Sequence, residues 1–153
     1  MILVPYPIRP ARVKCHSSPS LGAKLLIDRA TLPRVWVQTT PIDPSLPIRG
    51  RYLSLGMNVE PRGPVTEMDR VLLRVENGRL VAVRSDAGAR MAIRGRTLAD
   101  LIAFFIPEHA PDPSRRPAGE ELWAEVTVPK KGLPRPIRLG VKKDGTITPL
   151  NLN

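Results

Sequence analysis

Proline limits what this chain can fold into more than any other feature of its sequence. Eighteen of the 153 residues are proline, about 12%, whereas proteins average ~5%. A proline inside a helix costs about 3 kcal/mol, so the sequence argues against a helical bundle. A hydrophobic fraction of 42% with 25% charged residues is nevertheless typical of a folded domain rather than of a disordered chain.

Alternation of apolar and polar residues predicts strands at several places, because a period of two puts one set of side chains on the buried face of a sheet. Residues 52–59 give the clearest case, with Leu53, Leu55, Met57 and Val59 on one face. Similar patterns cover residues 35–39, 71–76, 79–84, 91–94, 122–128, 137–141 and 146–150. We therefore expect a mainly β fold, an antiparallel sandwich or partly open barrel of about six to nine short strands with one short helix.

Two dipeptides between apolar runs predict β-hairpins. Asn77-Gly78 and Asp144-Gly145 both supply the residues that tolerate positive φ in a two-residue turn. In the first hairpin this turn length sets the register and places Glu76 opposite Arg79. We expect an ion pair between these two side chains.

The one helix is expected just before Pro107. Thr97 and Asp100 fit the pattern of a helix start, and apolar residues follow at helical spacing, namely Leu98, Leu101, Ile102 and Phe105. The same run could instead form a buried strand, and the sequence leaves that alternative open.

The first twenty residues differ from the rest. Residues 1–20 carry four prolines and three serines and are predicted to be an extended arm, followed by a single mainly β domain over residues 21–153. No apolar run reaches the 18 residues of a membrane-spanning helix, and the start lacks the pattern of a signal peptide. A cytoplasmic location therefore stays open.

The formal net charge of +10 raises the question of an anionic partner. One basic stretch is free of acids, and we treat it as a candidate anion-facing set: Lys130, Lys131, Arg135, Arg138, Lys142 and Lys143. A solvated basic face is the favoured interpretation, with an anionic membrane surface or nucleic acid as alternatives. Aromatic residues make up only 4% of the chain, which is few for a platform that stacks bases.

Candidates for catalysis are sparse. Cys15 and His16 lie in the predicted arm, and His109 follows Glu108 in a predicted loop. The sequence contains no phosphate-binding glycine loop, no paired-cysteine motif and no zinc-protease motif. We expect no catalytic residues, no cofactor and no metal, and keep an unrecognised hydrolase that uses Glu108 and His109 as an alternative.

Two segments resemble a known family. In residues 41–57 the matching positions are Pro41, Asp43, Pro44, Gly50, Tyr52 and Leu55, and in residues 104–108 they include Phe105, Pro107 and Glu108. These segments are similar to the GDYXXLXY family of uncharacterised prokaryotic proteins, in which a P-x-D-P turn leads into a G-D-Y-x-x-L-x-Y strand. Arg51 stands at the position of the family aspartate and Met57 at that of its last tyrosine.

The resemblance implies a location more than an activity. Members look like small envelope proteins with an N-terminal membrane anchor, so it implies an extracytoplasmic, envelope-associated β domain that acts as a non-enzymatic accessory or interaction module. Its partner would be a protein, with a membrane protein as one option. The matching residues are expected to be structural, with Gly50 releasing a turn into the strand and Glu108 bonded to an arginine or to backbone amides.

Overall fold

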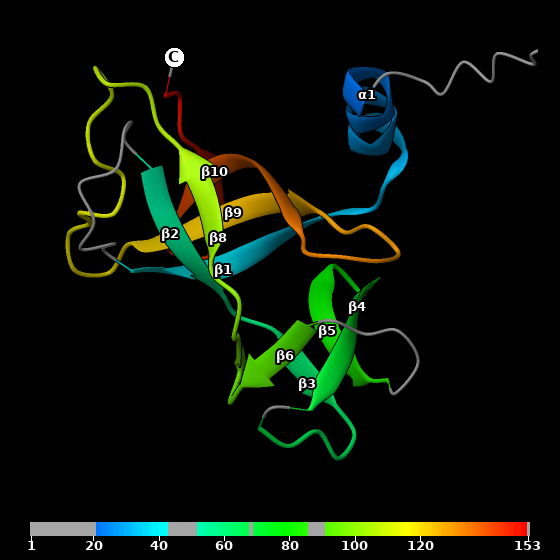
Figure 1. The fold of residues 1–153 in the computed structure, drawn as a ribbon. Coiled ribbons are helices and arrows are strands. Elements are labelled where there is room, and N and C mark those ends of the chain that lie inside the picture. Colours follow the sequence, from blue (N-terminus) through cyan, green and yellow to red (C-terminus); the bar gives the residue numbers. More distant parts are fainter. Residues whose placement is uncertain (1–20, 43–51, 68, 86–90, 153) are drawn as a thin grey trace, which may run out of the picture.

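The computed structural model describes residues 21–42, 52–67, 69–85 and 91–152. These residues form one helix and eleven strands in two sheets (Figure 1). The elements are α1 Leu21–Thr31, β1 Arg34–Ile42, β2 Tyr52–Met57, β3 Glu60–Arg62, β4 Arg70–Glu76, β5 Arg79–Arg84, β6 Met91–Arg94, β7 Thr97–Leu98, β8 Ile102–Phe105, β9 Glu121–Thr127, β10 Arg135–Lys143 and β11 Thr146–Pro149. The predicted mainly β fold is confirmed. Strand β3 was not predicted, because its three residues show no clear alternation, and β7 and β8 lie in the segment where a helix was expected and a strand left open.

The two sheets differ in size and pairing. The larger has six antiparallel strands in the order β11-β10-β9-β1-β2-β8. The smaller has five strands in the order β3-β5-β4-β6-β7, in which β3 runs parallel to β5. In Figure 1 the larger sheet fills the upper part of the view and the smaller sheet the lower part. Within the described ranges neither sheet closes into a barrel.

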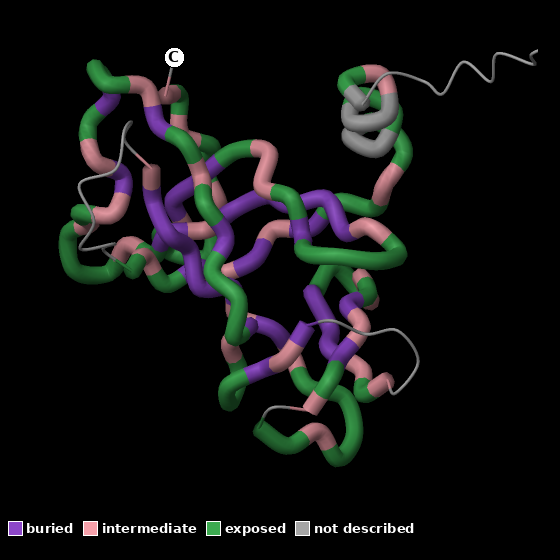
Figure 2. The backbone as a smooth tube through the Cα atoms, viewed as in Figure 1, coloured by how far each residue is buried: buried purple, intermediate pink, exposed green. Residues whose placement is uncertain are grey.

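One hydrophobic core joins the two sheets. Leu55 and Met57 on the inward face of β2 are fully buried, and so are Val71 of β4 and Ala82 of β5. Figure 2 shows buried backbone running through the strands of both sheets. Full burial of an aliphatic side chain contributes about 1.5–3 kcal/mol, so this shared core is what holds the sheets together.

Strand β2 is buried on both faces, which alternation alone did not predict. Ser54 and Gly56, on the face opposite the apolar set, are buried as well. The smaller sheet covers that face, because the side chain of Thr97 in β7 lies against Gly56. A second layer over a strand cannot be recognised from the strand's own residues.

Both predicted hairpins are confirmed, but one ion pair is not. Asn77 and Gly78 have φ values of 49° and 72°, and Glu76 is opposite Arg79, as expected. The two side chains nevertheless bond elsewhere. Arg79 donates to Glu60 at 2.7 Å, and Glu76 accepts from Arg62, because the unforeseen edge strand β3 brings opposite charges alongside.

The helix predicted over residues 97–105 is wrong, and the strand alternative is correct for most of it. Leu98 in β7 pairs with Ile93, and Ile102 in β8 pairs with Leu55. These two apolar side chains reach the core as strand residues, whereas Leu101 between the strands is exposed. Pairing with distant strands therefore outweighs the local helical spacing.

The helix of this structure is α1, in a segment for which no element was predicted. It stands away from both sheets in Figure 1, and Leu26 and Ile27 are 69% and 58% exposed. Among the described residues there is no helix with the length and apolar character that crossing a membrane requires.

The prolines inside strands occupy positions where a missing N–H does little harm. Pro41 lies in β1 beyond Gln38, the last residue of that strand paired with β9. Pro136 lies where β10 shifts register against β9. Pro61 and Pro149 lie in the edge strands β3 and β11. Edges and bulges are the usual sites for proline in sheets, so a proline-rich chain can still build two sheets.

Candidate binding groove

The residues of the family resemblance meet at one edge of the larger sheet. Pro41 pairs with Leu55, and Tyr52 pairs with Phe105, whose ring centroid lies 6.1 Å from that of Tyr52. Leu55 is fully buried, whereas Phe105 is 73% exposed. Two motifs about fifty residues apart in sequence thus become neighbours.

Several predicted residues of this set are outside the described residues, namely Asp43, Pro44, Gly50 and Arg51. Glu108 and His109 are exposed in a turn that follows the half-buried Pro107. The proposed bond from Glu108 to an arginine or to backbone amides stays a prediction.

The members of the predicted anion-facing set have different surroundings. Arg138 donates to Glu125 at 2.6 Å and lies 5.5 Å from the ring centroid of Trp36. Lys142 lies 4.5 Å from the ring centroid of Trp123, whereas Lys143 pairs with Glu120 at 3.5 Å. The other three are exposed between β9 and β10 or at the start of β10: Lys130, Lys131 and Arg135.

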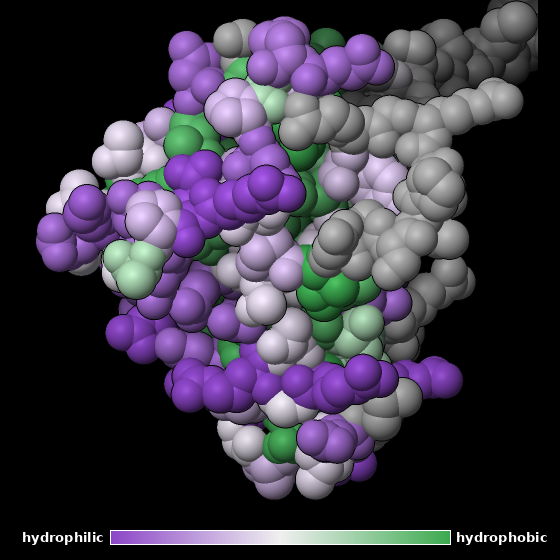
Figure 3. Space-filling model, turned by 90° about the vertical axis from the view of Figure 1, so that its left-hand side faces the viewer, coloured by the Kyte–Doolittle hydropathy of each residue, from purple (hydrophilic) through white to green (hydrophobic). Residues whose placement is uncertain are grey.

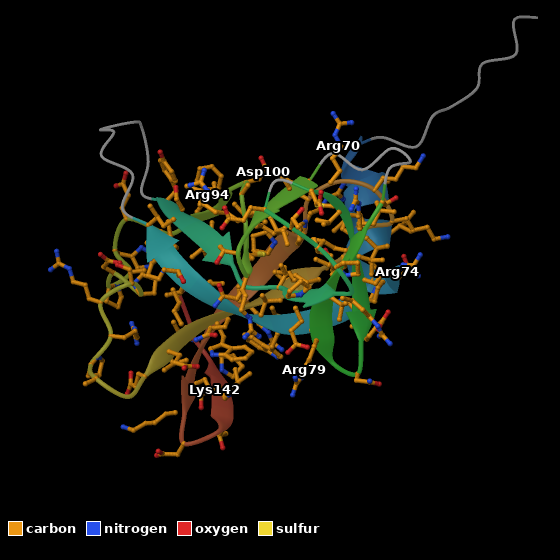
Figure 4. All side chains as sticks on the ribbon, turned by 90° about the horizontal axis from the view of Figure 1, so that it is seen from below. Arg70, Arg74, Arg79, Arg94, Asp100 and Lys142 are labelled. Atoms are coloured by element: carbon orange, nitrogen blue, oxygen red, sulfur yellow. The ribbon has the colours of Figure 1, made fainter. Side chains whose placement is uncertain are left out.

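A groove of about 730 Å³ lies between the two sheets, next to these tryptophans. One wall is the outward face of β1, β9 and β10, which contributes Trp36, Trp123 and Lys142. The other wall is the β4–β5 turn with Arg79, together with Arg96 from the β6–β7 turn. Figure 4 shows Arg79 and Lys142 extending from different sheets on the same side of the molecule.

Strand register explains the tryptophan wall. Trp36 is opposite Glu125, which is opposite Arg138, and these three outward side chains form a row across β1, β9 and β10. Trp123 is opposite Gly140 in the next row. The indole of Trp36 reaches over this glycine, since a Cβ at Gly140 would lie 2.8 Å from the ring. The missing side chain therefore makes room for the Trp36 ring.

The floor between the walls is polar. Asn58 donates from its side-chain amide to Gln38 at 3.2 Å and accepts from the Thr97 hydroxyl at 3.1 Å. Because these residues belong to different sheets or to the link between them, this chain of hydrogen bonds fixes the spacing of the walls. Asn58 and Gln38 both line the groove.

Most of the charged groups in the groove are already paired. Its two carboxylates are already engaged, Glu60 with Arg79 and Glu121 with the indole N–H of Trp123 at 3.0 Å. The side chain of Arg96 is exposed and has no carboxylate partner among the described residues. Over the same residues there is no cluster of three or more side chains that could hold a metal ion. What the site offers is cations and aromatic surface.

This groove was not among the sites predicted from the sequence. The two tryptophans are the only ones in the chain, and both fall at outward positions of predicted strands, which was a usable signal. Arg79 and Arg96 gave no signal, because only the fold brings them to the same groove.

Comparisons with known proteins add no functional assignment. Neither family models nor curated proteins nor solved structures gave a match to this chain.

Proposed function

We propose that the protein is a non-enzymatic binding module whose groove takes an acidic, extended segment of a partner protein. One observation supports this most directly: two tryptophans, each with a cation at its ring, face two arginines across the groove. Lys142, held at the Trp123 ring, and Arg96 are available to an incoming carboxylate, whereas Arg138 and Arg79 are already bonded to Glu125 and Glu60.

The shape of the groove favours an extended ligand. Its sheet-side lining comes from three adjacent strands, β1, β9 and β10, so it crosses the sheet. A chain segment laid along it would contact Trp36, Trp123 and Lys142 in turn. Nucleic-acid bases fit less well here, because stacking needs free ring faces and a cation already lies over each ring.

Intrinsic fluorescence tests the proposal directly, since the only two tryptophans of the chain both line the groove. The probe is a twelve-residue peptide of alternating glutamate and serine, compared with a lysine–serine peptide of the same length. We expect the acidic peptide to change the tryptophan emission along a saturable binding curve and the lysine–serine peptide to leave the emission unchanged. Equal responses to both peptides would reject the proposal.

Charge-removing variants localise the binding. Arg96→Gln and Lys142→Gln should each raise the dissociation constant about fivefold, since a partly exposed charge pair contributes about 1 kcal/mol. Lys130→Gln removes the same charge from an exposed loop outside the groove lining and should leave the affinity unchanged. An equal loss in all three variants would indicate attraction by net charge only.

The resemblance to GDYXXLXY proteins supports a further proposal, that the module works at the cell envelope on a protein partner. Fractionation of cells that express the full-length tagged protein tests this location. Recovery of the protein only with cytoplasmic markers would contradict it.

A further inference from the structure

A second basic surface lies on the outward face of the smaller sheet, and its residues do not line the groove. Arg70 and Arg74 are on β4, and Arg94 is on the neighbouring strand β6. Arg70 is opposite Ala92, so these two side chains point to the same side of the sheet. Arg74 is four positions from Arg70 and Arg94 is two positions from Ala92, and an even spacing along a strand keeps a residue on the same face. We call these three residues the arginine face. All three are exposed.

Figures 3 and 4 show the smaller sheet from two further sides. Figure 4 shows Arg70 and Arg74 extending outward from β4. In Figure 3 hydrophilic side chains form a band across the lower part of the molecule, at the height of the smaller sheet.

The arginine face differs from the other arginines of this sheet in lacking carboxylate partners. Arg62 pairs with Glu76, Arg79 with Glu60, and Arg84 with Asp69. Arg70, Arg74 and Arg94 have no carboxylate within 4.0 Å among the described residues. Asp100, which Figure 4 labels in the same region, is exposed and forms no ion pair with them. By register Glu60 and Glu76 point to the same side of the sheet, but they are already paired with Arg79 and Arg62. The like charges of the three arginines therefore repel one another until an external anion binds.

The spacing suits a chain of anions better than a single one. Arg70 and Arg74 are four residues apart on one strand, which corresponds to about 13 Å at 3.3 Å per residue. Guanidinium groups match phosphate oxygens with two parallel hydrogen bonds. Separate phosphates of a nucleic-acid backbone can contact these arginines as they stand, whereas a single phosphate would require both side chains to bend toward each other.

The side chains between the arginines argue against other partners. Leu72 and Ala92 are half-buried, and the described part of the face carries no aromatic side chain. Protein interfaces concentrate their energy in buried aromatic anchors, and surfaces that lie on membranes present large apolar residues to the lipid. Charge without such anchors is characteristic of contact with phosphates.

We propose that the arginine face binds the phosphate backbone of nucleic acid without sequence preference. The test is fluorescence anisotropy of the full chain with a labelled 20-base-pair DNA duplex and with one of its strands. The variant Arg70→Gln/Arg74→Gln/Arg94→Gln should bind at least tenfold more weakly, and its salt slope should fall by about 2 to 3, roughly one per lost phosphate contact. A second duplex of unrelated sequence should bind equally well.

A matched control separates local from overall charge. Lys130→Gln/Lys131→Gln/Arg115→Gln removes the same charge from exposed positions outside the smaller sheet and should reduce binding no more than twofold. Equal losses in both triple variants would overturn the proposal, and so would unchanged binding by the arginine-face variant. Binding to vesicles that contain phosphatidylserine, with none to either nucleic acid, would also overturn it, in favour of a membrane surface.

The duplex-binding test of the arginine face can be interpreted whether or not the groove binds an acidic peptide. The arginine-face variant should keep its tryptophan response to the acidic peptide, because none of the three arginines lines the groove. Loss of both activities would indicate misfolding, so urea unfolding of each variant is measured alongside. A variant as stable as the parent that still binds the duplex normally contradicts the arginine face alone.

Discussion

At the scale of single residues, Gly140 determines how the tryptophan wall is built. A Cβ there would lie 2.8 and 2.9 Å from two carbons of the Trp36 ring and 3.1 Å from Ile147. We expect Gly140→Ala to lower the free energy of unfolding by about 1–3 kcal/mol, the usual cost of overpacking. Urea unfolding measures this loss. In a Trp36→Ala background the same substitution should cost much less, and an equal cost in both backgrounds would show that the ring is not the obstacle.

Asp69 gives the protein a pH dependence that can be worked out at the same scale. Its pKa lies below the usual 3.8, chiefly because its carboxylate accepts hydrogen bonds from the backbone N–H and the hydroxyl of Thr66, with a smaller effect of Arg84. A lowered pKa means that the charged form stabilises the fold above pH 3.8 and that this stabilisation disappears as the pH falls through the lower, folded-state value.

The corresponding prediction uses Asp69→Asn. The variant should be less stable than the parent at pH 7, and the difference should shrink as the pH falls below about 4. Urea midpoints over this pH range measure it. Asp100→Asn, at an exposed aspartate, serves as the control, and a difference for Asp69→Asn that is constant with pH would contradict the assignment.

At the scale of elements, the two hairpins allow a comparison of turn chemistry. Gly78 and Gly145 both have positive φ, 72° and 82°, and a Cβ at either position would meet no atom within 4 Å. Alanine at either should therefore cost about 1–2 kcal/mol, the strain of a left-handed backbone alone. Urea unfolding checks both values. A near-zero cost at either position would mean that the turn relaxes to another type.

Elements differ in how far their own sequence determines them. The Asn77-Gly78 hairpin was predicted with its register because the turn and both strands are local in sequence. Residues 97–105 were predicted as a helix because the pairing that makes them strands comes from Ile93 and Leu55, outside the segment. The predicted Glu76–Arg79 ion pair is wrong for the same reason, since Arg62 and Glu60 of the distant strand β3 pair with these two residues instead.

At the scale of the whole molecule, the candidate site is a product of the fold. The outward position of Trp36 and Trp123 follows from strand alternation and was predictable. Their proximity to Arg79 and Arg96 depends on how the second sheet packs against the first, which no local pattern encodes. The net charge likewise gave no indication that some arginines are paired and that the arginine face is not.

Asn58 is where this packing can be tested. Its side chain joins the sheets by donating a hydrogen bond to Gln38 and accepting one from Thr97. Its backbone N–H also donates to the backbone carbonyl of Gln38 at 3.0 Å. Asn58→Ala should lower the free energy of unfolding by about 1–3 kcal/mol, because two partly buried partners lose their bonds. The variant should also bind the acidic peptide more weakly, since the hydrogen bonds that set the distance between the groove walls are lost. Unchanged stability and binding would show that the shared core alone sets the groove.

The prolines in the edge strands bear on how the protein behaves at high concentration. Leu150 donates to Leu139 on β10, so by alternation the missing N–H of Pro149 would have pointed away from the sheet. Pro61 likewise leaves β3 with one donor fewer. An exposed edge with a full row of donors recruits further strands and starts aggregation. A proline in one edge of each sheet interrupts that row, and mutual repulsion at a net charge of +10 acts in the same direction. Crowded copies of this chain should therefore stay dispersed rather than join edge to edge.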